Sequence, residues 1–239
     1  RDAIFLVFRF AFGIRPFPRR ARRPAMTMQL SCAHHTTCSR KCVMALVESG
    51  KDFEYVHIDM AAGGHKSAAF LAKHPFGKVP VLQDGDFTLF ESRAIMRYVL
   101  SGTPLDPSTK KEQALLDQAT SVEYSYFGPA FMPIYFERML KPAKKLGATD
   151  ETKVAAAIAE LGPVLDVVER LLEGKAYFAG DTFTMADITY MPYFAVFGKL
   201  GIEDMLSSRP NLARWWANVS QRPAWQYTFS GNVVEKAAK

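Results

Sequence analysis

The sequence predicts a mixed α/β domain followed by an all-helical domain, and three observations support that prediction. From residue 26 to residue 104, short apolar runs typical of strands alternate with amphipathic helical patterns. Residues 101–111, SGTPLDPSTKK, are rich in Pro, Ser and Thr and are typical of a linker. After the linker, the apolar residues have the spacing of helices. We therefore expect an α/β domain at 26–104 and a helical domain at 105–239.

The first half of the α/β domain contains a βαβ unit. The apolar run MQLSC at 28–32 predicts a strand, and the helical pattern at 38–50 ends at Gly50, a common stop signal. A second strand, FEYVHI, follows at 53–58. A connection of this length requires the two strands to be parallel. A short helix is expected at 65–74.

The second half of this domain is predicted to be a hairpin and a helix. The hairpin occupies 79–90 and turns at Asp84-Gly85, a strong turn signal. The helix spans 92–100, and Ser92 is a favourable N-cap residue for it. The whole order is β-α-β-α-β-β-α, which is that of the thioredoxin-like fold.

The helical domain has two clear signatures. Apolar residues recur at spacings of three and four from 154 to 172, which predicts one buried helix face. Thr184 and Asp187 form a capping-box pattern at the start of a later helix. Phe183 and Ile188 stand at the positions of a hydrophobic staple.

The basic charge of the chain is confined to its N-terminus. The formal net charge is +6, and residues 1–25 hold seven arginines against one aspartate, so the remainder is formally neutral. A neutral body lacks the field that attracts phosphate backbones, and we expect no nucleic-acid partner. We interpret 1–25 as an extension outside the fold. A transit peptide for organelle import is the alternative, because the segment is Arg-rich and acid-poor.

Cysteine use and hydropathy predict a cytoplasmic protein. Cys32, Cys38 and Cys42 are odd in number and clustered, unlike a disulfide framework, which favours a reducing compartment. The sequence contains no run of about 18 apolar residues, so no membrane-spanning helix is predicted. His34 and His35 lie near the cysteines, but the spacing matches no zinc pattern, so we expect no metal.

The stretch FGKVPVLQDGDFTLFES, residues 76–92, combines the predicted hairpin with an unusual proline. Pro80 lies inside the first strand, where it cannot donate a ladder hydrogen bond. Glu91 and Ser92 stand at the start of the next helix. A functional reason is therefore expected for this geometry.

Two stretches carry a resemblance to a known family. HPFGKVPVLQDGDFTLFESRAI at 74–95 and YFAGDTFTMADI at 177–188 resemble the soluble glutathione transferases, most closely the phi class of plants. The resemblance runs from about Met28 to about Trp225. It implies glutathione as co-substrate, no metal, and a homodimer.

The resemblance gives the proline a role. It implies a cis Val79-Pro80 peptide, which leaves the Val79 backbone free to pair with the cysteinyl part of glutathione. The start of the following helix suits the γ-glutamyl carboxylate, because its free N–H groups and dipole favour an anion. Ser92 adds a hydroxyl there, and Glu91 faces the ammonium.

The other end of glutathione needs cations. His65 and Lys66 match the His-Lys pair of the family, and Lys78 stands where phi enzymes usually have glutamine. A lysine brings full charge in place of an amide, so carboxylate binding becomes more sensitive to salt. The resemblance also places Arg93 among the glutathione-binding residues.

Catalysis in this family requires the glutathione thiolate, because the thiol is a poor nucleophile. An ungapped count places Thr36 where phi enzymes have the activating serine, and Thr37 is the alternative if the loop shifts by one. Arg40 matches a position that supports the site electrostatically. Cys38 lies two residues past Thr36, and we expect it to point away from the sulfur. If it is instead reactive, the enzyme becomes a cysteine-type thiol transferase.

The hydrophobic substrate is expected between the domains. The aromatic-rich stretch EYSYFGPAFMPIYFERML, 123–140, offers five candidates, of which we expect two to face the pocket: Tyr124, Phe127, Phe131, Met132 and Tyr135. The predicted function is conjugation of glutathione to hydrophobic electrophiles in detoxification, with reduction of organic hydroperoxides as an additional activity. The alternatives are a non-catalytic carrier of hydrophobic ligands, the thiol transferase, and a structural module such as that of a translation elongation factor gamma subunit.

Overall fold

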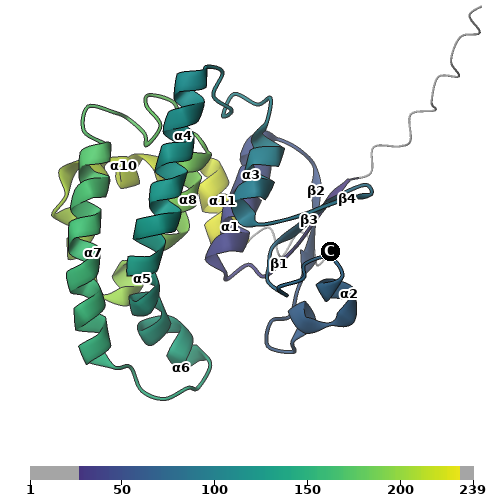
Figure 1. Cartoon of the computed structure of the whole chain (residues 1–239), viewed down its shortest axis with the longest axis horizontal. Coiled ribbons are helices and arrows are strands. Elements are labelled where there is room, and N and C mark those ends of the chain that lie inside the picture. The colour runs from purple at the N-terminus through teal and green to yellow at the C-terminus, as the bar shows by residue number, and fades with distance from the viewer. Residues whose placement is uncertain (1–26, 232–239) are drawn as a thin grey trace, which may run out of the picture.

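The computed structural model describes residues 27–231, which form two units side by side (Figure 1). The predicted extension at 1–25 lies outside the described residues. Residues 28–100 form a four-stranded sheet with its helices, and residues 110–230 form the helical unit. The mixed α/β arrangement followed by helices confirms the predicted fold class.

The sheet has the strand order β2-β1-β3-β4. β1 and β2 are parallel with Met28 opposite Phe53, while β3 is antiparallel to both β1 and β4. The elements of this unit are β1 (Met28–Cys32), α1 (Thr37–Ser49), β2 (Phe53–His57), η1 (Gly64–Lys66), α2 (Ala68–Leu71), β3 (Val81–Asp84), β4 (Phe87–Phe90) and α3 (Ser92–Leu100). Gly50 ends α1 in the left-handed conformation that glycine adopts readily (φ 65°).

The start of α3 differs from the prediction. Ser92 is the first residue of the helix, and the N-cap is Glu91, whose side chain caps nothing. Glu91 has φ 72°, a left-handed conformation that costs a non-glycine residue roughly 1–3 kcal/mol. We predicted Ser92 as the N-cap because serine is a better N-cap residue than glutamate. The N-cap therefore lies one residue earlier than predicted.

The helical unit is built around a long helix that changes its winding twice. Pro129 and Pro133 have no backbone N–H, so a regular α-helical ladder cannot continue through this stretch. Two π-helical turns, η2 and η3, flank α5. The elements along it are α4 (Lys110–Val122), η2 (Glu123–Phe127), α5 (Gly128–Tyr135), η3 (Phe136–Leu140) and α6 (Lys141–Ala143).

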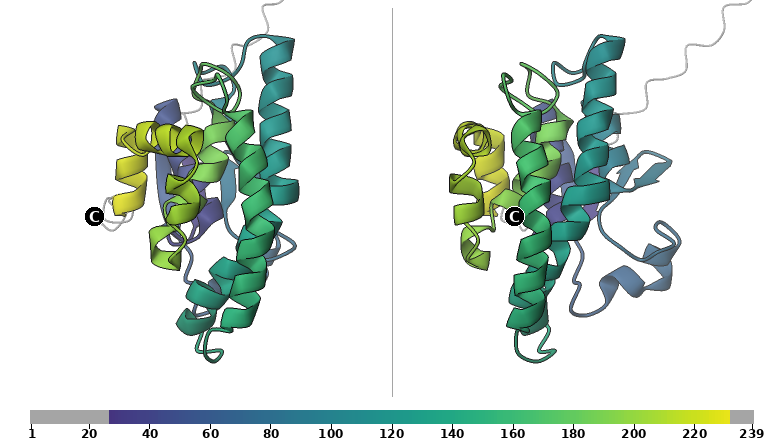
Figure 2. Two further views of the ribbon diagram at one scale, coloured as in Figure 1. Left: turned by 90° about the vertical axis from the view of Figure 1, so that its left-hand side faces the viewer. Right: turned by 60° about the vertical axis from the view of Figure 1, so that its left-hand side comes forward.

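α7 (Glu151–Leu171) runs back alongside this long helix (Figures 1 and 2). Its predicted apolar stripe is buried, apart from the half-buried Ile158. The remaining elements are α8 (Met185–Phe194), η4 (Gly198–Leu200), α9 (Asp204–Ser207), α10 (Pro210–Val219) and α11 (Pro223–Ser230).

The capping box at the start of α8 forms as predicted. The Asp187 carboxylate accepts hydrogen bonds from the Thr184 backbone N–H at 2.9 Å, from the Phe178 N–H at 3.1 Å and from Trp215 Nε1 at 2.9 Å. All ten residues of α8 are buried. α8 is therefore the central helix of the helical unit.

α1 joins the two units. One side of α1 packs on α3, and the other side packs on α8 and α11 (Figure 1). Glu48 near its C-terminus accepts hydrogen bonds from Arg222 at 2.7 and 2.9 Å. The position of the N-terminus of α1 is consequently fixed from both units. Among residues 27–231, no helix is both long and apolar enough to cross a bilayer.

Candidate active site in the interdomain cleft

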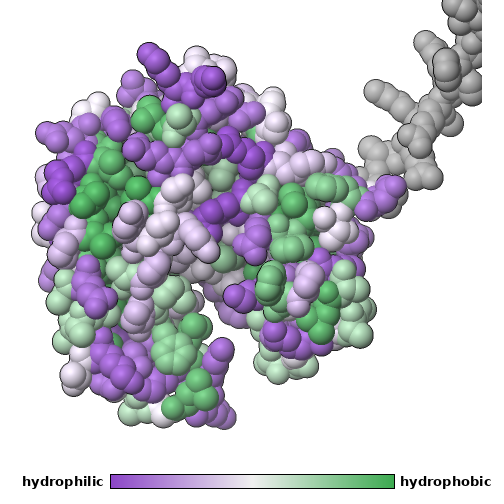
Figure 3. All heavy atoms as spheres, in the orientation of Figure 1, coloured by the Kyte–Doolittle hydropathy of each residue, from purple (hydrophilic) through white to green (hydrophobic). Residues whose placement is uncertain are grey.

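A cleft of about 780 Å³ opens between the sheet unit and the helical unit. The space-filling view shows the molecule hollowed between the two units (Figure 3). One wall is polar and comes from the β3–α3 region. The other wall is more apolar and comes from η2, α5 and α8.

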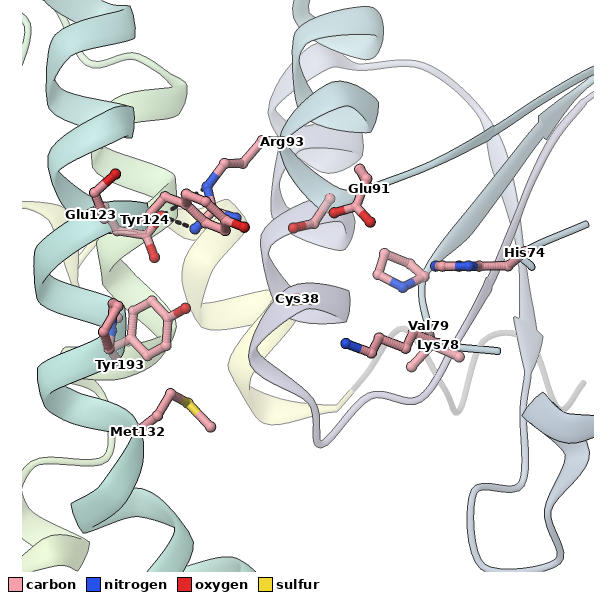
Figure 4. Close-up of a pocket in the computed structure, with 15 residues that line it drawn as sticks. Cys38, His74, Lys78, Val79, Glu91, Arg93, Glu123, Tyr124, Met132 and Tyr193 are labelled. Carbon is pink, nitrogen blue, oxygen red and sulfur yellow. Dashed lines mark hydrogen bonds and ion pairs between the residues drawn. The ribbon is translucent and has the colours of Figure 1, made fainter. Parts of the chain in front are cut away.

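The polar wall contains most of the residues predicted to bind glutathione. Its lining residues are His74, Lys78, Val79, Pro80, Glu91, Ser92 and Arg93 (Figure 4). The Val79-Pro80 peptide is cis, as expected from the resemblance. β3 begins at Val81, so Val79 precedes the paired part of the strand. Its backbone therefore lies at the cleft, beyond the sheet ladder.

The predicted cations are divided between the cleft and the surface. Lys78 is exposed and lines the cleft. His65 and Lys66 are not among the lining residues, and the Lys66 ammonium donates to the Phe76 carbonyl at 3.1 Å. Their role as glutathione ligands stays a prediction.

Thr36 is the N-cap of α1. Its hydroxyl oxygen accepts the Ser39 backbone N–H at 3.2 Å and lies 2.7 Å from Ser39 Oγ and 3.1 Å from the Ala33 carbonyl oxygen. Thr37 is the first residue of α1. Neither threonine is among the residues that line the cleft. To donate to a sulfur, Thr36 must give up one of these local hydrogen bonds, so its activating role stays a prediction.

Cys38 lies where we did not expect it. It lines the cleft, so the expectation that its side chain points away from the site is wrong (Figure 4). Cys38 is the second residue of α1, and this end of the helix lies between the two walls (Figure 4). Cys32 and Cys42 are buried, and burial raises the pKa of the Cys32 thiol to about 12. Cys38 is therefore the one cysteine that a ligand in the cleft can reach.

Arg40 lies away from the cleft lining. Its guanidinium stands 4.8 Å from the centre of the Phe229 ring, and burial lowers its pKa. Within residues 27–231, no group of three His, Cys, Asp or Glu side chains could hold a metal ion.

The apolar wall receives two of the five hydrophobic candidates. Tyr124 and Met132 line the cleft and are 67% and 38% exposed. Phe127 and Phe131 are completely buried, so a direct role for them in substrate binding is wrong. Their rings stack in the core because they lie on the opposite face of the same helix. Tyr135 is half-buried, stacks on Phe131, and does not line the cleft.

A buried charge cluster borders the cleft and was missed by sequence reasoning, although two of its members, Glu123 and Arg93, line the cleft. Glu123 and Lys41 are both inaccessible to solvent, and Lys41 Nζ donates to Glu123 Oε1 at 3.2 Å. Arg93 donates to the other oxygen of Glu123 through Nε at 3.0 Å and also through Nη2. Arg93 also stands 4.8 Å from the centre of the Tyr124 ring. The cluster connects α1 and α3 to the helical unit. Arg93 is predicted to bind glutathione, and in this structure its guanidinium is hydrogen-bonded to Glu123.

His74 is a second lining residue that the prediction missed. It is only 2% exposed, and its Nδ1 has no hydrogen-bond partner. Its ring stacks on Phe90 with 4.5 Å between the centres. Burial lowers the pKa of His74, an effect that the Glu91 charge opposes. A neutral imidazole therefore forms part of the polar wall of the cleft.

Comparison with known proteins identifies the family. The N-terminal domain model of glutathione S-transferases matches residues 28–101, and the C-terminal domain model matches residues 126–223. Glutathione S-transferase F13 of Arabidopsis thaliana is 37% identical over 222 residues, covering 87% of this chain and 98% of the relative. A glutathione S-transferase of Hyoscyamus muticus is 35% identical over 205 residues, with coverage of 84% and 96%.

Solved structures agree with the sequence comparison. Glutathione transferase F7 from Populus trichocarpa superimposes with a TM-score of 0.81 at 36% identity, covering 86% of this chain and 99% of that one. Glutathione S-transferase I from maize, in complex with an atrazine glutathione conjugate, gives a TM-score of 0.79 at 34% identity, with coverage of 85% and 97%. The chain belongs to the glutathione S-transferase family of enzymes and is similar to its plant phi-class members, which confirms the resemblance.

Proposed function

We propose that this enzyme conjugates the glutathione thiolate to hydrophobic electrophiles, with glutathione as its co-substrate. The observation that carries the proposal is the two-walled cleft. A polar wall around the cis Val79-Pro80 peptide and Ser92 faces a more apolar wall around Tyr124 and Met132. Such a cleft can hold a charged tripeptide against an apolar acceptor.

Glutathione lies along the polar wall in this proposal. The Val79 backbone pairs with the cysteinyl residue, and Ser92 at the start of α3 binds the γ-glutamyl carboxylate. Glu91 compensates the γ-glutamyl ammonium. Lys78, with His65 and Lys66 from the neighbouring loop, holds the glycyl carboxylate.

The sulfur is activated at the N-terminus of α1. Thr36 supplies the hydroxyl, with Thr37 as the alternative, and the helix dipole favours the thiolate. The thiolate then displaces a leaving group or adds to an activated double bond. An organic hydroperoxide is a further acceptor: the thiolate attacks its distal oxygen, the O–O bond breaks and the alcohol leaves. A second glutathione then reduces the resulting sulfenic acid, which gives oxidised glutathione and water. Arg40 supports the site at longer range.

The test is an assay of conjugation with a chlorinated nitroaromatic acceptor and glutathione. Formation of the thioether, dependent on both substrates and identified by mass, supports the proposal. Glutathione binding without conjugation of any acceptor favours the carrier alternative. Failure to bind glutathione refutes both, and leaves the structural module.

Cys38 supports a second candidate function, because its side chain lines the glutathione cleft. In a thiol transferase, the Cys38 thiolate attacks the glutathione sulfur of a mixed disulfide, and the other thiol leaves as the S–S bond breaks. A glutathione thiolate then attacks the new Cys38–glutathione disulfide, which frees Cys38 and gives oxidised glutathione. The discriminating variant is Cys38→Ser. Conjugation that survives the change supports the hydroxyl mechanism, whereas disulfide reduction that disappears with it supports the cysteine mechanism.

The proposal includes a homodimer in the cytoplasm. Free cysteines in all three positions suit a reducing compartment. Sedimentation of the purified protein tests the dimer, and imaging of a tagged full-length chain tests the location.

A further inference from the structure

His74 places an imidazole in the polar wall of the cleft, where it is almost completely enclosed. The residue lies between α2 and β3, lines the cleft and is only 2% exposed. Its ring stacks on Phe90 and packs edge-to-face with Phe76, with ring centres 4.5 and 6.1 Å apart. The imidazole is therefore held from two sides, and the tip of the ring points into the space between Glu91 and Lys78 (Figure 4).

The hydrogen bonding of this ring is incomplete. Nδ1 of His74 is buried and has no hydrogen-bond partner. Lys73, the preceding residue, is directed elsewhere and donates to Gln83 at 2.7 Å. One nitrogen of a neutral imidazole donates and the other accepts, whereas both donate in the protonated ring. Protonation therefore gives the tip of His74 a charged N–H donor, which suits a carboxylate in the cleft.

Three charged side chains act on the ring. Glu91 favours the protonated imidazole, whereas Lys78 ahead of β3 and Lys66 of η1 disfavour it. The His74 backbone carbonyl also favours the protonated ring, although it forms no regular hydrogen bond. Burial is the largest influence and lowers the pKa of His74, so the ring is neutral at pH 7 without a ligand.

We propose that His74 is a glutathione-binding residue, and that its imidazole takes up a proton from solvent when the tripeptide binds. The inference rests on the proposed function and deepens it, because it uses the same binding mode. There the glycyl carboxylate lies at Lys78, the γ-glutamyl ammonium at Glu91 and the γ-glutamyl carboxylate at the start of α3. Two carboxylates and one ammonium add one net negative charge to the polar wall. That charge favours the imidazolium.

Displacement of water by the ligand acts in the opposite direction, since it favours the neutral ring. His74 has almost no water to lose, because it is only 2% exposed before a ligand binds. The added negative charge therefore has the larger effect, and the pKa of His74 rises in the complex. The affinity for glutathione is then highest below the pKa of His74 in the free enzyme. The additional affinity is lost as the pH rises through the pKa of His74 in the complex.

The test uses S-methylglutathione, which has no thiol and so separates binding from activation of the sulfur. Between about pH 5.5 and about pH 7.5 its carboxylates stay ionised and its amine, which lies next to a free carboxylate, stays protonated. We expect calorimetry to show binding roughly 3- to 10-fold tighter at the acid end, since one unit of pKa shift is a tenfold change in affinity. Titrations near pH 6.5 in two buffers of different ionisation enthalpy should show uptake of a fraction of a proton.

Three variants assign the proton. His74→Gln keeps a neutral hydrogen-bond donor but cannot be protonated, so its affinity should not depend on pH in this range. His57→Gln is the matched control, because His57 is an exposed histidine at the end of β2 that does not line the cleft. Its proton uptake should equal that of the wild type. His65→Gln removes the histidine proposed at the glycyl carboxylate, and proton uptake should persist in this variant also.

The inference is overturned if the wild type takes up no proton. It is also overturned if the uptake survives in His74→Gln or disappears in His65→Gln. Weaker binding on acidification contradicts it too, because that sign is expected of a carboxylate that loses its charge. If His74→Gln does not fold, the wild type and the other two variants decide. Absence of S-methylglutathione binding at every pH refutes the proposed function itself, whereas binding without proton uptake refutes the role of His74 alone.

Discussion

Replacing Glu123 by glutamine should destabilise the enzyme strongly, because this one carboxylate pairs with two cations. Glu123 and Lys41 are inaccessible to solvent, and the Arg93 side chain is 24% exposed. Glutamine keeps the shape but removes the charge, and its amide N–H₂ group must face a cation. The amide oxygen can still accept a hydrogen bond from Lys41, but no negative charge remains to compensate the buried ammonium.

The magnitude follows from the burial of the cluster. Removing one partner of a buried ion pair costs about 3–5 kcal/mol, because the other charge stays buried without compensation. Arg93 can turn toward solvent, so most of the cost comes from Lys41. A typical domain has only about 5–15 kcal/mol of stability, so the loss should be obvious.

The assay is urea unfolding of the wild type and Glu123→Gln with a comparison of the free energies of unfolding. Asp117→Asn is the matched control, since it removes the carboxylate partner of Arg97 at a site where Asp117 is 64% exposed. An exposed pair contributes at most about 1 kcal/mol. A loss below about 1 kcal/mol in Glu123→Gln, similar to the control, would refute the reasoning.

The effect should also depend on pH. Burial lowers the pKa of Lys41, and the Glu123 charge opposes that shift. Without Glu123 the folded-state pKa falls further below the unfolded value. The folded state of the variant then favours the neutral Lys41 amine. This contribution to the free energy of unfolding is fully present above the pKa of Lys41 in the unfolded chain, and it is lost as the pH falls toward the pKa of the folded state. The deficit of Glu123→Gln should therefore shrink as pH rises toward about 10. A deficit that is constant from pH 7 to 10 would contradict the assignment to Lys41.

Three further outcomes are expected. Ser92→Ala should weaken glutathione binding by about 1–3 kcal/mol, measured by calorimetry, because it leaves a charged group without a hydrogen bond; unchanged affinity would place the γ-glutamyl end elsewhere. Thr36→Ala should lower turnover and raise the pKa of bound glutathione, whereas Thr36→Ser should retain most activity; a larger effect from Thr37→Ala would move the activator by one residue. Asp187→Ala should lower the unfolding free energy by at least about 3 kcal/mol, since three buried N–H donors, among them Trp215 Nε1, lose their acceptor; a change under about 1 kcal/mol would show that water replaces the carboxylate.

Local patterns in the sequence were enough for the elements of the fold. The parallel pair of β1 and β2, the hairpin at Asp84-Gly85 and the α8 capping box each depend on residues close together in the chain. The cis peptide was expected from the resemblance, because base rates alone favour trans. These features are confirmed because short-range chemistry decides them.

The site was harder to predict, because its parts come from distant segments. Lys41 and Glu123 are 82 residues apart, and nothing in the local sequence of either pairs them. The aromatic stretch contained the two cleft residues, but a π-helical turn shifts the phase of the helix there. Simple 3.6-residue counting therefore could not separate Tyr124 from the buried Phe127. Cys38 was misplaced for a similar reason, since its orientation depends on how α1 is seated between the units.

The seating of α1 determines how the cleft can adapt. Lys41 connects this one helix to Glu123 at the start of η2, and Glu48 connects it to Arg222 just before α11, while its other side packs on α3. Such a helix leaves no hinge about which the walls could separate. Acceptors of different shape must then be fitted by the exposed side chains of Tyr124 and Met132, of which the unbranched methionine adapts most readily. The distance between the two walls of the cleft is therefore fixed, whereas the side chains that line one wall can adapt. The thickness of an acceptor should limit its binding more strictly than the shape of its edges.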